Sequence, residues 1–123
     1  MSKIVAVIGA SGDRRKFGNK AVRAFRSQGY TVVPVNPRET EIEGLKAYPS
    51  VTDIPGPVDM ATVYLSREAG LRVMPEIAQK GIKEVWLNPG ADDDGVIAAA
   101  RAAGLEPIVA CSIMGIGESP ARF

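Results

Sequence analysis

The sequence of 123 residues contains no histidine. Histidine is the most frequent general base in enzymes and the most frequent zinc ligand, so Ser–His and Cys–His nucleophile pairs are excluded. The only cysteine, Cys111, has no partner for an intrachain disulfide, which favours a reducing, cytoplasmic compartment. Cys111 lies near the end of an apolar stretch, and this position predicts a buried thiol. These absences argue against a self-sufficient enzyme.

Excess charge and long apolar runs are also missing. Fifteen Lys and Arg residues nearly balance fourteen Asp and Glu residues, so the formal net charge is +1. The chain has no global field to attract nucleic acid or an anionic membrane, and an anion site must be local. No apolar run approaches the roughly 18 residues of a membrane span. Residues 4–10 could mimic a signal-peptide core, but the charged residues that follow favour a first strand. We expect neither nucleic acid nor membrane as a partner.

What is present is an alternation of strand-like and helix-like segments. Apolar, β-branched runs predict buried strands at residues 4–8, 31–35, 60–65, 84–87 and 107–110. Helical spacing predicts helices over residues 19–28, after Ser66 and over an alanine-rich stretch whose first turn contains the acidic run 92–94, each followed by a glycine. Pro75 either begins the main part of the second helix or kinks it. Residues 38–58 predict an irregular connection with a short strand near residues 46–48, and residues 111–123 predict an irregular tail.

This alternation predicts one domain over residues 1–123. Such units cross over right-handed and bury a parallel sheet between helices. The expected fold is a Rossmann-like, doubly wound three-layer α/β domain with a mostly parallel five-stranded sheet. Ligands bind beyond the carboxyl ends of the strands in such a sheet. Four segments converge there, at residues 9–18, 36–38, 65–67 and 87–90.

The first of these segments has the composition of a phosphate site. Small residues let backbone amides approach a ligand oxygen, a serine adds a hydroxyl, and cations precede the helix: Gly9, Ala10, Ser11, Gly12, Arg14, Arg15 and Lys16. This combination suits a pyrophosphate. The alternative is a tight strand–helix turn with solvated basic residues. The Gly-x-x-Gly spacing also differs from the dinucleotide-binding fingerprint.

The other strand ends bear on which nucleotide binds. An NAD site commonly has an acidic residue after the second strand, whereas this chain has Asn36, Pro37 and Arg38. A neutral end followed by arginine allows the 2′-phosphate of NADP or the 3′-phosphate of coenzyme A (CoA). Asn88, beyond the fourth strand, can donate to a ligand, whereas Trp86 is interpreted as core. The acidic run 92–94 is interpreted as charge at a helix start, and no metal site is predicted.

The order of motifs carries a family resemblance. It rests on residues 8–11 and 35–37 after the first two strands, on Tyr-Pro-Ser-Val at 48–51 before Asp-Ile-Pro at 53–55, on residues 82–86 and on the late Cys111. Over essentially the whole chain, this pattern resembles small stand-alone CoA-binding proteins and the N-terminal domain of the succinyl-CoA synthetase α subunit. The chain departs from that family at residues 88–90, where glutamine commonly appears, and no histidine is present to replace the synthetase's phosphorylated one.

The resemblance implies that CoA or acyl-CoA lies across the strand ends. Its phosphates would meet residues 9–14, with Ser11 and Arg14 as donors, and its nucleotide end would approach Asn36, Pro37 and Arg38. Leu65 and the segment 87–89, including Asn88 and Pro89, would flank the pantetheine or the adenine. The complete set of predicted contacts is Gly9, Ala10, Ser11, Gly12, Arg14, Lys16, Asn36, Pro37, Arg38, Leu65, Asn88 and Pro89.

Three functional hypotheses follow. The first is a non-catalytic binding, carrier or regulatory module for CoA or acyl-CoA. The second is an NADP-binding oxidoreductase fragment or subunit, favoured by Arg38 alone. The third is a structural interaction module with a vestigial pocket. An unidentified protein partner or a homo-oligomer stays open in each case.

Overall fold

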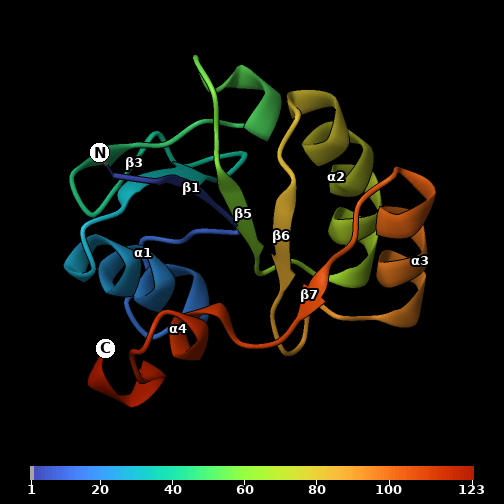
Figure 1. Cartoon of the computed structure of the whole chain (residues 1–123). Helices are drawn as coiled ribbons and strands as arrows, with labels where there is room; N and C mark the ends of the chain where they lie inside the picture. Colours follow the sequence, from blue (N-terminus) through green and yellow to red (C-terminus); the bar gives the residue numbers. More distant parts are fainter. Residues whose placement is uncertain (1) are drawn as a thin grey trace.

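One five-stranded parallel sheet forms the centre of the protein (Figure 1). The computed structural model describes residues 2–123. The strand order is β2-β1-β5-β6-β7, with bounds β1 (Ile4–Ile8), β2 (Thr31–Val35), β5 (Met60–Val63), β6 (Glu84–Leu87) and β7 (Ile108–Val109). In chain order this is 2-1-3-4-5, one of the two common doubly wound arrangements. The predicted five-stranded, Rossmann-like α/β fold is confirmed.

Helices cover both faces of the sheet. Helices α1 (Phe17–Ser27) and α4 (Ser112–Gly115) pack on one face, while α2 (Arg67–Lys80), α3 (Asp94–Ala102) and the 3₁₀ turn η1 (Val51–Asp53) pack on the other (Figure 1). Side chains alternate between the faces along β1, so Val5 and Val7 join the α1 layer and Ala6 and Ile8 join the α2 layer. Because both faces are buried, β1 is a continuous apolar run.

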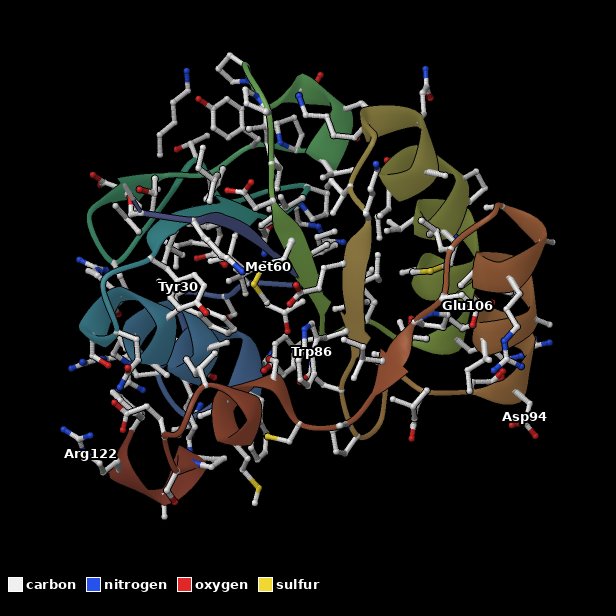
Figure 2. All side chains as sticks on the ribbon, viewed as in Figure 1. Tyr30, Met60, Trp86, Asp94, Glu106 and Arg122 are labelled. Atoms are coloured by element: carbon white, nitrogen blue, oxygen red, sulfur yellow. The ribbon has the colours of Figure 1, made fainter. Side chains whose placement is uncertain are left out.

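The α1 layer also receives side chains from the inner strands. Met60 of β5 and Trp86 of β6 point to that side of the sheet, among the side chains shown in Figure 2. Trp86 is half-buried, and its indole N–H donates to Glu84 at 2.9 Å. The interpretation of Trp86 as a core residue therefore agrees with its packing.

The connection between residues 38 and 58 is more ordered than expected. It contains an antiparallel hairpin of β3 (Glu41–Ile42) and β4 (Leu45–Lys46), turned by Glu43 at φ 52° and Gly44 at φ 76°. Ile42 is buried under the α1 layer, which anchors the hairpin. Tyr48 then forms a parallel bridge with Val35. The predicted short strand near residues 46–48 is thus confirmed in part.

Two expectations about helices are settled by the structure. Helix α2 runs from Arg67 to Lys80 with Pro75 inside it, which excludes the alternative that the helix begins at Pro75. The tail is also not irregular, since it contains α4 and the 3₁₀ turn η2 (Pro120–Arg122). Ile113 of α4 is fully buried against the α1 layer, and this contact holds the tail in place. In the part of the chain described, no helix combines the length and the apolar character needed to cross a bilayer.

Candidate functional site

A groove of about 650 Å³ opens where the chain switches from one face of the sheet to the other. Neighbouring strands β1 and β5 are followed by helices on opposite faces, α1 and α2, and such a switch point leaves a crevice at the strand ends. The groove is lined by residues 9–11 and 16–18 after β1, 36–39 after β2, 64–66 and Ala69 after β5, and 89–91 after β6. All four predicted segments contribute to it.

Close backbone packing shapes the loop after β1. Gly9 has φ +93°, and a Cβ there would lie 2.2 Å from the carbonyl oxygen of Tyr64. Gly18, the second residue of α1, is equally tight, because its Cβ would lie 2.2 Å from the carbonyl oxygen of Gly9. The Gly9 N–H donates to Val35 at 3.1 Å. The two glycines let β2, β5 and α1 meet at one loop.

The same loop presents backbone donors to the groove. The N-cap of α1 is Lys16, whose side chain makes no capping hydrogen bond. Within residues 2–123, the N–H groups of Ala10, Ser11, Phe17 and Gly18 have no protein acceptor. All four residues line the groove. Free N–H groups at the start of a helix of eleven residues, together with its positive dipole end, form a ready anion site.

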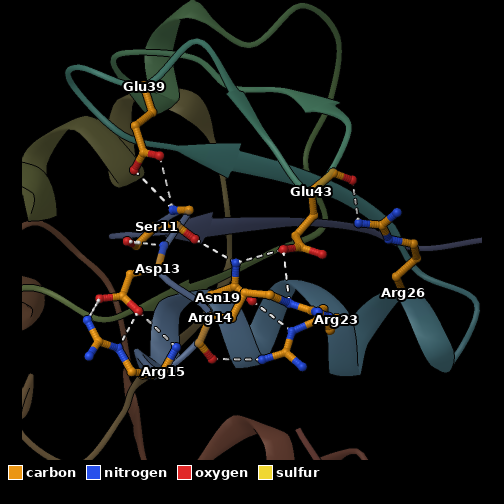
Figure 3. A network of polar contacts seen from close by, with 10 residues as sticks. Ser11, Asp13, Arg14, Arg15, Asn19, Arg23, Arg26, Glu39 and Glu43 are labelled. Atoms are coloured by element: carbon orange, nitrogen blue, oxygen red, sulfur yellow. Dashed lines mark hydrogen bonds and ion pairs between the residues drawn. The ribbon is translucent and has the colours of Figure 1, made fainter.

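The three cations of the loop differ in their surroundings, and Figure 3 shows two of them, Arg14 and Arg15. Arg15 makes two hydrogen bonds of 3.0 Å to Asp13, which lower the pKa of Asp13 to about 2. Arg14 lies 3.5 Å from Glu43, outside the groove, and its side chain is 65% exposed. Among the described residues, Lys16 takes part in no ion pair, and it lines the groove. The structure thus brings Lys16 to the groove and places Arg14, for which a phosphate contact is also expected, outside it.

Asn36 ties the end of β2 to the glycine loop. Its Nδ2 donates to the carbonyl oxygen of Ala10 at 2.9 Å, and its Oδ1 accepts from the N–H groups of Arg38 and Glu39 at 2.8 and 2.9 Å. Pro37 and Arg38 are exposed at the edge of the groove. Asn36 therefore lines the site and also sets the course of the segment that presents Arg38.

Glu39 is a groove residue that the sequence prediction missed. Both of its carboxylate oxygens lie 3.1 Å from the N–H of Gly12, and Oε2 accepts from Asn36 Nδ2 at 3.2 Å. Gly12 itself does not line the groove, because the carboxylate lies over it. No local sequence signal points to this contact, because Glu39 and Gly12 lie 27 residues apart.

Asn88 is buried below the groove, contrary to its prediction as a ligand donor. It is 1% exposed, and its two amide hydrogens go to Thr62 Oγ1 at 2.7 Å and to the Val63 carbonyl at 3.0 Å. Its Oδ1 accepts from the N–H of Ser112 at 2.8 Å. The amide has no hydrogen left for a ligand. Asn88 joins β5, β6 and α4 beneath the loop that carries Pro89.

Tyr64 and Cys111 lie near this buried network. The Tyr64 hydroxyl is 3.2 Å from Ser112 Oγ, and burial raises the pKa of the Tyr64 phenol above its ordinary value. Cys111 caps α4 and is half-buried, so it is more accessible than the sequence predicts. It follows β7 by two residues, where the sequence places it.

Comparison with known proteins shows to which family the chain belongs. Residues 3–116 match the family model of a CoA-binding domain. The chain belongs to this CoA-binding domain family. The resemblance drawn from the sequence motifs is confirmed, and CoA ligases share the same domain.

Three relatives illustrate the range of the family. The α subunit of ADP-forming acetate–CoA ligase II from Pyrococcus furiosus is 43% identical over 84 residues, covering 68% of this chain and 18% of the relative. The uncharacterized protein YneT from Bacillus subtilis is 32% identical, covering 72% of this chain and 66% of YneT. The solved structure of a conserved hypothetical protein from Pyrococcus furiosus has a TM-score of 0.81 and 34% identity, covering 94% and 99% of the two chains. The chain spans less than a fifth of the first curated relatives, which are acetate–CoA ligases.

Within this CoA-binding domain, most of the predicted contacts line one groove. They are Gly9, Ala10, Ser11, Lys16, Asn36, Pro37, Arg38, Leu65 and Pro89. Gly12, Arg14 and Asn88 do not, because Gly12 lies under Glu39, Arg14 turns to Glu43 and Asn88 is buried. Residues 64–66 and Ala69 extend the groove toward α2.

Proposed function

We propose that this chain binds CoA or acyl-CoA in the strand-end groove, as a non-catalytic binding, carrier or regulatory module. The observation that carries the proposal is the set of free N–H groups at the uncapped start of α1, beside the unpaired Lys16. Neutral and cationic donors at one helix start match a pyrophosphate. Membership of the CoA-binding domain family supports CoA as the ligand that carries this pyrophosphate.

The groove suggests an orientation for the ligand. The pyrophosphate would meet Ala10, Ser11 and the start of α1, and the 3′-phosphate would lie near Arg38 at the end of β2. Leu65 and Pro89, on the other side of the groove, would flank the adenine or the pantetheine. Because Arg38 also suits the 2′-phosphate of NADP, both nucleotides belong in the binding test.

The non-catalytic part of the proposal rests on the chemistry of the lining residues. They include no histidine and no cysteine, and Glu39 is their one acid. Tyr64 holds its proton more firmly than an ordinary phenol because burial raises its pKa. The ligases among its relatives carry this domain in much longer chains, so we propose that a protein partner supplies any chemistry done on the bound thioester. Because Cys111 is the only cysteine and cannot form an intrachain disulfide, we propose the cytoplasm as the compartment of this protein.

Binding should depend on two groove cations and not on Arg14. We expect Lys16→Ala to raise the Kd of CoA by about tenfold or more, the value of one charge-assisted phosphate hydrogen bond. Arg38→Gln should remove the preference of the wild type for CoA over dephospho-CoA, which lacks the 3′-phosphate. Isothermal titration calorimetry measures both affinities for each variant.

Two arginines provide matched controls for this test. Arg14→Ala removes a neighbouring loop cation that faces Glu43, and Arg101→Gln removes an exposed cation on α3. Both should leave the CoA affinity unchanged. Tighter binding of NAD or NADP than of CoA would refute the proposed ligand, and a loss of affinity on Arg14→Ala would place that side chain at the phosphates.

The purified chain should not turn over acyl-CoA. Cys111 has no histidine to activate it, since the chain contains none. We expect free-thiol release from acetyl-CoA, followed with a colorimetric thiol reagent, to stay at the background rate. Hydrolysis well above background that disappears in Cys111→Ser would make the protein an enzyme. Cys111→Ala serves as a second variant that lacks the thiol.

A further inference from the structure

A carboxylate already occupies part of the glycine loop. Figure 3 shows Glu39 reaching from the segment after β2 to the loop after β1. The N–H of Gly12 lies 3.1 Å from each carboxylate oxygen, and Asn36 Nδ2 donates to Oε2 at 3.2 Å. One of the small-residue amides that suit an anion is therefore taken by an anion of the protein itself.

The position of this carboxylate is well defined by its neighbours. The N–H of Glu39 donates to Asn36 Oδ1 at 2.9 Å, while Asn36 Nδ2 also holds the Ala10 carbonyl at 2.9 Å. A Cβ on Gly12 would lie 2.5 Å from Glu39 Oε1, so the carboxylate packs directly over the glycine Cα. One asparagine thus fixes the carboxylate and the loop in register.

No cation neutralises Glu39. The loop arginines are engaged elsewhere, Arg14 with Glu43 and Arg15 with Asp13. Among residues 2–123, no Lys or Arg nitrogen lies within 4.0 Å of the Glu39 carboxylate. Its negative charge is held by neutral donors, inside a groove that also contains Lys16 and the free N–H groups of α1.

We propose that Glu39 is an internal anion that competes with the ligand's pyrophosphate for the glycine loop and so weakens binding. This inference rests on the proposed function, since it concerns the same groove. A pyrophosphate on Ala10 and Ser11 either displaces the carboxylate from Gly12 or stays beside it. Displacement costs the hydrogen bonds to Gly12 and Asn36, and proximity costs like-charge repulsion. Both routes lower the affinity, which keeps the ligand exchangeable.

The test is the neutral isostere Glu39→Gln, with Glu41→Gln as a matched control. Glu41 lies two residues further on, is exposed and does not line the groove. Glu41→Gln therefore removes the same charge from the same segment without changing the groove. We expect Glu39→Gln to bind CoA about three- to tenfold more tightly by calorimetry, and Glu41→Gln to bind as the wild type does. The gain should be equal for dephospho-CoA, which keeps the pyrophosphate.

The outcomes separate this inference from the proposed function. Unchanged or weaker binding by Glu39→Gln, with the wild type binding CoA, overturns the inference alone; weaker binding would mean that the carboxylate accepts a ligand hydroxyl. An equal gain in Glu41→Gln also overturns it, because the effect would then come from net charge. Failure of every folded variant to bind CoA overturns both proposals. Circular dichroism checks folding, and Glu39→Ala should show the same direction of change.

Discussion

Replacing Gly18 by alanine is expected to destabilise the domain and to weaken CoA binding together. The added methyl group would lie 2.2 Å from the carbonyl oxygen of Gly9 and 3.2 Å from the Cα of Ala10. Both are backbone atoms, so relief requires movement of the loop or of α1. Overpacking of this kind costs about 1–3 kcal/mol of unfolding free energy. The N–H groups of the displaced loop would also no longer point at a bound phosphate. We therefore expect the Kd of CoA to rise by about tenfold or more.

Gly95 provides the control at the same helix position. It is the second residue of α3, as Gly18 is of α1. A Cβ on Gly95 would meet only side-chain atoms of Asp93 and Arg67, at 3.1 to 3.5 Å. Gly95→Ala should therefore be neutral or stabilising, since alanine is a better helix former by about 1 kcal/mol. Urea denaturation and calorimetry measure both variants, and equal stability of the two would refute the packing argument.

The sheet could be predicted because its strands carry an unambiguous pattern. β1 is apolar on both faces, and the structure buries both, with Val5 and Val7 on one side and Ala6 and Ile8 on the other. The tail could not be predicted in this way. Helix α4 has four residues, which is too short for a periodic signal, and it exists because Ile113 packs against the α1 layer. Tertiary contact, and not local propensity, decides that segment.

The residues of the candidate site likewise fall into those that the sequence could place and those that it could not. Residues next to strand ends, such as Ser11, Pro37 and Pro89, reach the groove because the topology carries them there. Side chains whose partners lie far away in the sequence could not be placed. Glu39 bonds to Gly12 across 27 residues, and Asn88 bonds to Thr62 across 26. A single sequence gives positions along strands, but it does not show which polar group satisfies which.

Replacing Asn88 by alanine is also expected to destabilise the protein strongly, because Asn88 belongs to a buried hydrogen-bond network. Asn88, Thr62 and Ser112 are almost fully buried. The Asn88 amide donates to Thr62 Oγ1 at 2.7 Å and accepts from the Ser112 N–H at 2.8 Å. Truncation would leave the Ser112 N–H without this acceptor, whereas the Val63 carbonyl would keep the backbone N–H of residue 88 at 3.4 Å. A buried polar group left unsatisfied costs about 1–3 kcal/mol, so we expect a loss of about 1–3 kcal/mol in the free energy of unfolding.

Gln79→Ala is the matched control, because Gln79 carries the same amide on the exposed side of α2 and should cost little. Urea denaturation gives the stability of each variant, and calorimetry at low temperature, where Asn88→Ala is folded, gives its CoA affinity. The two roles of Asn88 predict opposite results. If Asn88 serves to join β5, β6 and α4 in the interior, Asn88→Ala should lower the free energy of unfolding and leave the CoA affinity close to that of the wild type. A ligand donor would leave stability unchanged and raise the Kd, and that result would return Asn88 to the binding site.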